Sequence, residues 1–207
     1  MLRTESKQIL LSIIAISILI IAFVGVSYAA FQTLVSSDEN SISTGTISLE
    51  LSNQSDSISI SNAMPMSDQE GMLLEGEGNV YDFNVNTSLS ANTLLNYEVS
   101  MEKLDVDGEE LSDKDVHIYL EKLEGDQYVS TPITHTPQAF MPITEDSFLG
   151  TKSGQMVLYS GTFSNTTDAS KEMVEHFRLR MWVAQDVIID STSKSFQVKL
   201  NVTAKAV

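Results

Sequence analysis

Several stretches of this 207-residue chain alternate apolar and polar side chains with a period of two residues. Successive side chains of a β-strand point to opposite faces of a sheet, so this spacing creates one apolar and one polar face. Strands of this kind are half-buried and are typical of antiparallel sheets that cover a core on one side. The pattern predicts strands in residues 46–51, 80–87, 95–104, 116–123, 177–183 and 196–202.

Turn-forming residues such as glycine, asparagine and aspartate separate these stretches. Weaker strands are expected in residues 57–61, 128–133 and 156–163, and residues 55–79 are expected to form a long connection. The one helical signal after the N-terminus is short and lies in residues 168–175, where an aspartate could cap a turn. Many short strands without a crossover helix predict an all-β fold, a two-sheet antiparallel β-sandwich of jelly-roll or immunoglobulin-like topology.

The N-terminus carries a hydrophobic run, Ile9–Val24, which follows two basic residues. Such a run is typical of a signal peptide, or of an N-terminal membrane-anchoring helix when it reaches about 20 residues. Ser27 and Ala29 are small residues at the positions that a signal peptidase requires for a cut between Ala29 and Ala30. Cleavage is favoured and a retained anchor stays open; both send the rest of the chain across the membrane. The expected organisation is a signal peptide or anchor helix in residues 1–29, an extended segment in residues 30–43 and a β-sandwich domain in residues 44–207.

The composition excludes one class of partner and one kind of stabilisation. The chain has 28 acidic and 12 basic residues, and its formal net charge is −16 at pH 7. A charge of this sign repels nucleic acid, which is therefore excluded as a partner, and repels anionic lipid headgroups. The sequence has no cysteine, so stability must come from a packed core and not from disulfides.

The residue types that serve catalysis do not occur in the spacings that catalysis requires. The histidines, His117, His135 and His176, are far apart in the sequence, and no H-E-x-x-H motif is present. No serine stands in a G-x-S-x-G motif. We therefore expect no enzymatic activity, no catalytic residue, no metal-binding residue and no cofactor.

One acidic stretch resembles the start of a calcium-binding loop. Asp105, Asp107 and Glu109 alternate as the first ligands of such a loop do, but Gly108 comes two positions too early for the full pattern. An Asp-Gly pair between two alternating stretches is a common hairpin turn, and we favour the turn.

The only tryptophan, Trp182, shares one face of its alternating stretch with Arg178 and Arg180. An exposed ring flanked by cations could form a surface platform for a sugar or a protein partner. Because tryptophan is highly buried on average, we favour the alternative in which the connection around Met64–Met66 covers the ring.

The junction "YAAF", the acidic "SDEN" and the following "NSISTGTISLEL" resemble the start of the camelysin and TasA-type family of secreted proteins of Gram-positive bacteria. The matching positions are Ala29, Phe31, Asp38, Glu39, Asn40, Thr44, Gly45, Ile47 and Leu49. The resemblance implies that a SipW-type signal peptidase removes the leader, which holds the chain at the membrane until then. It also implies a jelly-roll-like domain at the cell surface or outside the cell, related to subunits of biofilm-matrix fibres.

In that family, assembly proceeds by strand exchange, in which the N-terminal segment of one subunit completes a sheet of its neighbour. Residues 30–43 carry the apolar side chains for this role, namely Phe31, Leu34, Val35 and Ile42. A head-to-tail contact that does not close generates filaments, so the implied partner is another copy of the chain or a related matrix protein. Two alternatives stay open. The segment could pack on its own domain, or the chain could be a membrane-anchored extracellular binding module for a carbohydrate, calcium or a protein.

Overall fold

The computed structural model describes residues 33–36, 47–52, 57–61, 63–75, 80–188 and 194–206. The chain divides into two units, Met1–Gln32 and Thr33–Val207, and the described residues all belong to the second. The expected N-terminal helix, the cleavage residues Ala29 and Ala30, and Phe31 and Ile42 of the exchange segment lie outside the described residues. The buried apolar residues of the described part run from Leu49 to Val202, so the second unit holds its own core. We therefore expect residues 33–207 to fold without residues 1–32.

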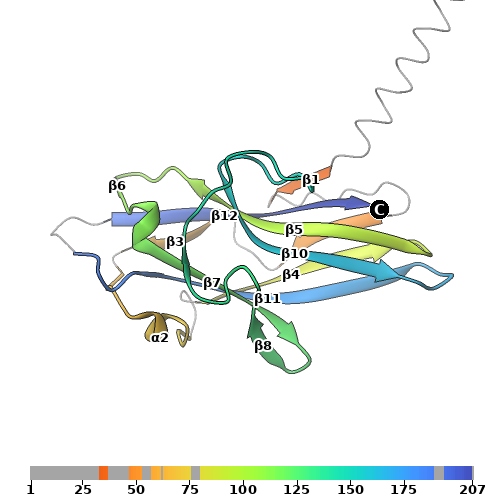
Figure 1. Cartoon of the computed structure of the whole chain (residues 1–207), viewed down its shortest axis with the longest axis horizontal. Coiled ribbons are helices and arrows are strands. Elements are labelled where there is room, and N and C mark those ends of the chain that lie inside the picture. The colour runs from red at the N-terminus through yellow and green to blue at the C-terminus, as the bar shows by residue number, and fades with distance from the viewer. Residues whose placement is uncertain are drawn as a thin grey trace, which may run out of the picture. The chain divides into compact units, whose positions relative to one another are not determined.

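Two β-sheets form the second unit and pack face to face as a sandwich (Figure 1). Sheet A contains β1 (Thr33–Ser36), β3 (Ile58–Ser61), β5 (Thr93–Leu104), β6 (Glu109–Glu110), β10 (Gln155–Asn165) and β12 (Lys194–Ala206). Sheet B contains β2 (Ile47–Ser52), β4 (Val80–Leu89), β7 (Val116–Glu124), β8 (Gln127–Ser130), β9 (Gln138–Ala139) and β11 (Lys171–Val183). Apart from the parallel contact of β6 with β12, the strands within each sheet pair antiparallel. The predicted two-sheet antiparallel sandwich is confirmed.

The order of the strands identifies the topology as a jelly roll. Sheet A runs β1-β12-β5-β10, with β3 beside β1 on β12, and sheet B runs β2-β4-β11-β7-β8. When the two-residue strands β6 and β9 are set aside, only β7 and β8 follow one another within a sheet. The connections from β4 to β5, β5 to β7, β8 to β10, β10 to β11 and β11 to β12 all change sheets. An immunoglobulin-like fold keeps more of its consecutive strands in one sheet. Periodicity alone left these two topologies open because it contains no strand order.

The apolar faces of both sheets meet in one core that is rich in aromatic rings. Phe83 and Phe177 stack within sheet B at a centroid distance of 5.3 Å, and Tyr97 and Phe163 stack within sheet A at 4.8 Å. Tyr159 joins the two pairs, since its ring lies 5.1 Å from that of Phe177. Large buried rings contribute most of the apolar area that a cysteine-free domain of this size needs.

The helix expected in residues 168–175 is wrong, because β11 already begins at Lys171. Lys171–Glu175 pairs with Leu89–Val85 of β4, and this sheet pairing overrides the weak local preference for a helical turn. The weak strand expected in residues 57–61 is present as β3. The same connection also contains a short helix that was not expected, α2 (Asp68–Gly71).

The turn at Gly108 does not join two paired strands. Gly108 has a positive φ of 117°, as a turn glycine does, but β6 beyond it pairs with β12 and not with β5. The prediction of a hairpin is therefore wrong, because the strand after the turn does not pair with the strand before it. Residues 113–115, which follow soon after, form a 3₁₀ turn that leads into β7.

Candidate functional site

The first described strand, β1, lies at an edge of sheet A and pairs antiparallel with the end of β12. Leu34 stands opposite Thr203, and Val35 stands opposite Val202. These two residues of the predicted exchange segment are therefore part of an edge strand. In the described structure, this strand completes a sheet of its own domain.

The same side of β12 carries a second short strand in line with the first. β3 pairs with residues 195–198 of β12, and β1 pairs with residues 201–204, so only Lys199 and Leu200 lie between them. We call this side of β12 the β12 edge. Two strands of four residues thus share an edge that one continuous strand could occupy. The edge is a candidate site for a strand from another chain.

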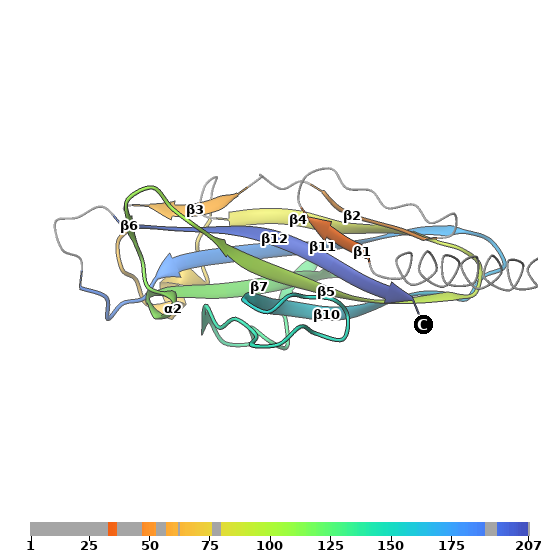
Figure 2. The same cartoon turned by 90° about the horizontal axis from the view of Figure 1, so that it is seen from above.

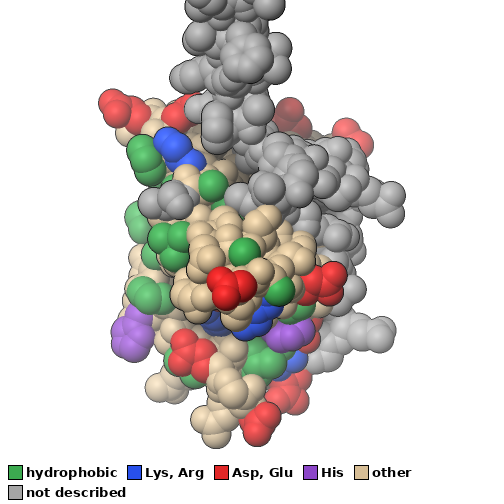
Figure 3. Space-filling view, turned by 90° about the vertical axis from the view of Figure 1, so that its right-hand side faces the viewer, with side chains coloured by type: hydrophobic (Ala, Val, Ile, Leu, Met, Phe, Trp, Pro, Cys, Tyr) green, Lys and Arg blue, Asp and Glu red, His purple; other side chains and the backbone are tan. Residues whose placement is uncertain are grey.

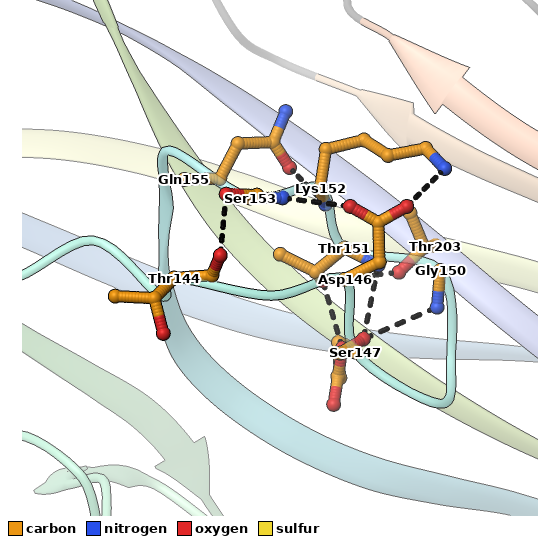
Figure 4. A network of polar contacts seen from close by, with 10 residues as sticks. Thr144, Asp146, Ser147, Gly150, Thr151, Lys152, Ser153, Gln155 and Thr203 are labelled. Carbon is orange, nitrogen blue, oxygen red and sulfur yellow. Dashed lines mark hydrogen bonds and ion pairs between the residues drawn. The ribbon is translucent and has the colours of Figure 1, made fainter.

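A loop on the outer face of sheet A supports β12 at this place (Figure 4). Within residues 140–155, the hydroxyls of Ser147 and Thr151 donate hydrogen bonds to Glu98 Oε2 on β5, at 2.5 and 2.7 Å. The Thr151 hydroxyl also lies 3.3 Å from that of Thr203, in the part of β12 that pairs with β1. The loop therefore fixes β5 and β12 side by side where the N-terminal strand docks.

The polar groups inside this loop bind one another. Lys152 Nζ lies 2.7 Å from Asp146 Oδ2, and the backbone N–H of Ser153 donates to Asp146 Oδ1 at 3.0 Å. These bonds lower the pKa of Asp146 below its ordinary value, with the Lys152 hydrogen bond contributing most. Because the carboxylate of Asp146 and the hydroxyls of Ser147, Thr151 and Ser153 already have partners, we interpret the loop as a structural support and not as a ligand site.

The candidate platform around Trp182 is covered in the structure. We call residues 63–75, which include α2, the covering segment. The backbone of Gly71 lies so close to the indole that a Cβ there would stand 2.2 Å from two ring carbons. Trp182 is 1% exposed and cannot offer a ring face to a ligand. The exposed platform thus gives way to the covered alternative, in which Gly71, in the same connection as Met64–Met66, lies against the ring.

Two further contacts fix the covering segment to sheet B. The N–H of Met66 donates to the carbonyl of Val183 at 3.1 Å, and Asp68 Oδ1 lies 2.6 Å from His117 Nδ1. A capping box between Ser67 and Glu70 closes the first turn of α2. The sequence "SDQE" carries this signal, so it could have revealed the helix.

Arg180 anchors the C-terminal part of the covering segment and is itself buried, with 7% exposure. Its Nε donates to the carbonyl of Leu74 at 2.8 Å, and its Nη1 donates to the carboxylate of Glu121 on β7. Because Arg180 is buried, it offers little surface to a ligand, and we interpret it as a structural anchor.

Arg178 lies two residues before Arg180 on β11, in a part of the outer face of sheet B where the side chains are half-buried or exposed. It binds Asp82 through two hydrogen bonds of 2.8 Å, and its guanidinium lies 4.1 Å from the centre of the Tyr128 ring. The Asp82 hydrogen bonds outweigh desolvation and raise the pKa of Arg178 above its ordinary value. Next to it, His176 Nδ1 lies 2.7 Å from Asn84 Oδ1. We call Asp82, Asn84, Tyr128, His176 and Arg178 the sheet B array.

A polar network connects the two sheets inside the sandwich. The Tyr97 hydroxyl donates to the carboxylate of Glu175, and Lys122 Nζ lies 2.7 Å from this carboxylate and 3.0 Å from the Tyr159 hydroxyl. Burial, and then the hydrogen bond and charge of Glu175, raise the pKa of Tyr97 far above its ordinary value. Desolvation lowers the pKa of Lys122, but its bonds to Glu175 and Tyr159 outweigh this and raise it. Neither group is activated as a nucleophile, because both hold their protons more tightly than usual.

This network predicts a loss of stability at alkaline pH. Above a pH of about 10 the unfolded chain releases protons that folded Tyr97 and Lys122 retain. The contribution of these two groups to the free energy of unfolding is therefore fully present below their ordinary pKa values, and it is lost as the pH rises from those values towards the raised ones. For Tyr97 the free energy of unfolding should fall by about 1.4 kcal/mol per pH unit. Urea titrations between about pH 8 and about pH 11 measure the slope. In Tyr97→Phe the free energy of unfolding should fall less steeply with pH, by the amount that corresponds to one proton, about 1.4 kcal/mol per pH unit. An unchanged slope would contradict the raised pKa of Tyr97.

The three histidines lie apart from one another and do not form a metal-binding group with the described acidic residues. Within the described residues, no three His, Asp or Glu side chains lie close enough to share a metal ion. His135 lies 3.3 Å from the Ser130 hydroxyl, and His117 and His176 have the separate partners named above. No helix in the described ranges has the length and apolar character needed to cross a bilayer.

Comparisons with known proteins leave the family open. No family model matches the chain, and no curated protein matches it. Among solved structures, the VP2 subviral particle of infectious bursal disease virus is similar, with a TM-score of 0.36 and 10% identity, over 78% of this chain and 33% of that one. The chain therefore spans about a third of the length of this capsid protein.

Two smaller proteins are similar over most of their length. TmCBM61 in complex with β-1,4-galactotriose gives a TM-score of 0.25 and 6% identity, over 84% of this chain and 86% of that one. The family 32 CBM of C. perfringens NanJ in complex with galactose gives 0.22 and 5%, over 73% and 98%. Likenesses this remote carry no argument about what the present chain binds.

Proposed function

We propose that this chain is an exported structural subunit that works outside the cell and joins further copies of itself by exchanging its N-terminal strand. The observation that carries the proposal is the position of β1, a strand of four residues at the β12 edge. The hydrophobic run Ile9–Val24, the possible cut between Ala29 and Ala30 and the family resemblance support the same function.

The physical case rests on the weak and replaceable attachment of β1. A short terminal strand at a sheet edge is held by few hydrogen bonds, and its release leaves unpaired those N–H and C=O groups of residues 201–204 that face β1 and not β5. The same strand from a second copy restores the same pairs, so exchange costs little free energy. Each subunit then gives one strand and receives one, and the head-to-tail contact grows into a filament.

The proposal is tested with the chain that starts at Ala30. We expect electron microscopy to show filaments that lengthen with protein concentration. In Val35→Pro, filaments should be absent while the domain stays folded, because proline removes a donor from β1 and fixes its φ. Ile188→Pro, which changes a residue that is 90% exposed and lies outside the strands and the helix, is the matched control and should still form filaments. Monodisperse particles of the Ala30 chain at all concentrations would contradict the proposal.

A direct assay of the β12 edge complements the microscopy. A chain that starts at Thr44 lacks β1 and should bind a synthetic peptide of residues 30–43 with a 1:1 ratio in calorimetry. The peptide that carries Val35→Pro should bind at least tenfold more weakly, because the edge recognises the backbone. Equal binding of the two peptides would show that strand pairing is not the contact.

The sheet B array favours a second candidate, an extracellular binding module. Its groups are planar, exposed or half-buried, and held in place by hydrogen bonds, with the charges of Arg178 and Asp82 paired. Such a surface suits the hydroxyl groups of a neutral saccharide. Calorimetry with galactose and cellotriose tests it, and Arg178→Met should abolish any binding. The absence of heat with both sugars would remove them as ligands of this surface.

A further inference from the structure

Sheet A has a second edge, β10, which lies on the opposite side from β1 and β3 (Figure 2). β10 has eleven residues and pairs with β5; among the described strands, none pairs with its other side. A long edge presents a row of unpaired N–H and C=O groups, which other chains can bind.

The other edges of the sandwich carry the features that usually prevent such binding. β1, β3 and β8 have four residues each and β9 has two, which is too short for a strong pairing. β2 has six residues and contains a charge, Glu50. The N-terminal half of β11 is a second open edge next to β10, and it contains Lys171, Glu172 and Glu175.

β10 lacks these features over most of its length. A bulge at Leu158 interrupts its N-terminal part, where the Thr131 hydroxyl donates to the Leu158 carbonyl at 3.4 Å. Beyond the bulge, Tyr159–Asn165 reads "YSGTFSN", with no Asp, Glu, Lys, Arg or Pro. Ser160, Thr162 and Ser164 are exposed on the outer face of the sheet, and Phe163 is buried on the inner face.

We propose that Tyr159–Asn165 is a self-association edge that pairs antiparallel with the same segment of a second copy. Two identical antiparallel strands match their backbone donors and acceptors around a two-fold axis, so one segment can serve as both partners. The absence of charge decides in favour of a second copy. Acidic side chains lie scattered over the end of the domain that Figure 3 shows. Two chains of net charge −16 repel one another, so they approach best where no charge lies between them.

This contact is distinct from strand exchange at the β12 edge. Exchange uses β1 and one side of sheet A and grows head to tail, whereas the β10 pairing uses the other side and closes as a symmetric dimer. Together they would join filaments laterally in pairs, but each can fail without the other.

Single cysteines on β10 test the proposal, because the natural chain has none. The background is the chain that starts at Ala30 and carries Val35→Pro, which blocks strand exchange. Three variants of this chain are oxidised mildly, alone and in pairwise mixtures: Ser160→Cys, Thr162→Cys and Ser164→Cys. Opposed residues of antiparallel strands lie within reach of a disulfide, so at least one sample should give a cross-linked dimer at least tenfold faster than Gln69→Cys. If none does, the proposal is overturned.

Charge at the edge supplies an independent readout. Sedimentation should show that dimers of the unmodified Val35→Pro chain increase when salt rises from about 0.05 M to about 0.5 M, since salt screens the repulsion. Ser160→Lys with Ser164→Lys lowers the net negative charge, yet it should weaken dimerisation at least tenfold. The double variant Gln69→Lys with Gln127→Lys changes the net charge by the same amount at exposed positions elsewhere. Its dimerisation should be unchanged or stronger. Equal dimerisation of the two double variants would refute the edge, as would a chain that stays monomeric throughout.

Discussion

Replacing Arg180 by methionine is expected to lower the free energy of unfolding by about 3–5 kcal/mol. The side chain is buried and binds Glu121, whose own side chain is 13% exposed. Without the guanidinium, the carboxylate stays in a place that water reaches poorly and has lost its charge partner. The carbonyl of Leu74 also loses its donor, which loosens the covering segment. Urea unfolding followed by circular dichroism gives the free energy directly.

A double-mutant cycle separates the charge from the packing. Glu121→Met in the Arg180→Met background removes the unpaired carboxylate, so it should recover most of the loss and leave about 1 kcal/mol for the Leu74 carbonyl. Arg178→Met is the matched control on the same strand. Its partner Asp82 is half exposed, so the cost should stay below about 1 kcal/mol. Equal costs for the two arginine variants would show that burial does not decide their contributions.

The second large effect is expected for Gly71→Ala. The added Cβ would stand 2.2 to 2.7 Å from three ring carbons of Trp182, and a buried indole between two packed layers cannot give way by that much. The covering segment must therefore lift, which should cost about 2–3 kcal/mol and admit water to the ring. Because Trp182 is the only tryptophan, its fluorescence should shift to longer wavelength while the domain stays folded.

The control for this prediction is Gln69→Ala, an exposed position on the same helix, which should change the free energy of unfolding by less than about 0.5 kcal/mol. Wild-type fluorescence and stability in Gly71→Ala would mean that the covering segment does not rest on the ring as described. Both measurements use a single protein preparation, since the emission maximum and the unfolding curve come from the same tryptophan.

The strands were largely predictable from the sequence because each long strand buries only one face. Phe83 and Val85 alternate with Asp82 and Asn84, and this local pattern shows both the strand and its inner side. The start of β11 was not predictable in this way. Its first two residues, Lys171 and Glu172, are exposed and polar, so pairing with β4, distant in the sequence, decides their conformation.

The surroundings of the candidate sites could not be predicted from the sequence pattern either. Alternation correctly places Trp182 on the outer face of its strand, but it does not show which segment lies over that face. Likewise, the sequence of Tyr159–Asn165 indicates a strand but not that this strand ends the sheet. Both features depend on strand order and on contacts between distant residues, which hydrophobic periodicity does not contain.

The central place of β12 has a consequence for how sheet A folds. Among the described strands β12 lies furthest along the chain, and it pairs with β1, β3, β5 and β6, so these strands stay without their common neighbour until β12 docks. Contacts between residues so far apart in sequence form slowly, because the loops they close carry a large entropic cost. Assembly of sheet A should therefore be the slow step of folding, because it waits for β12 to insert between strands that lie far from it in the sequence.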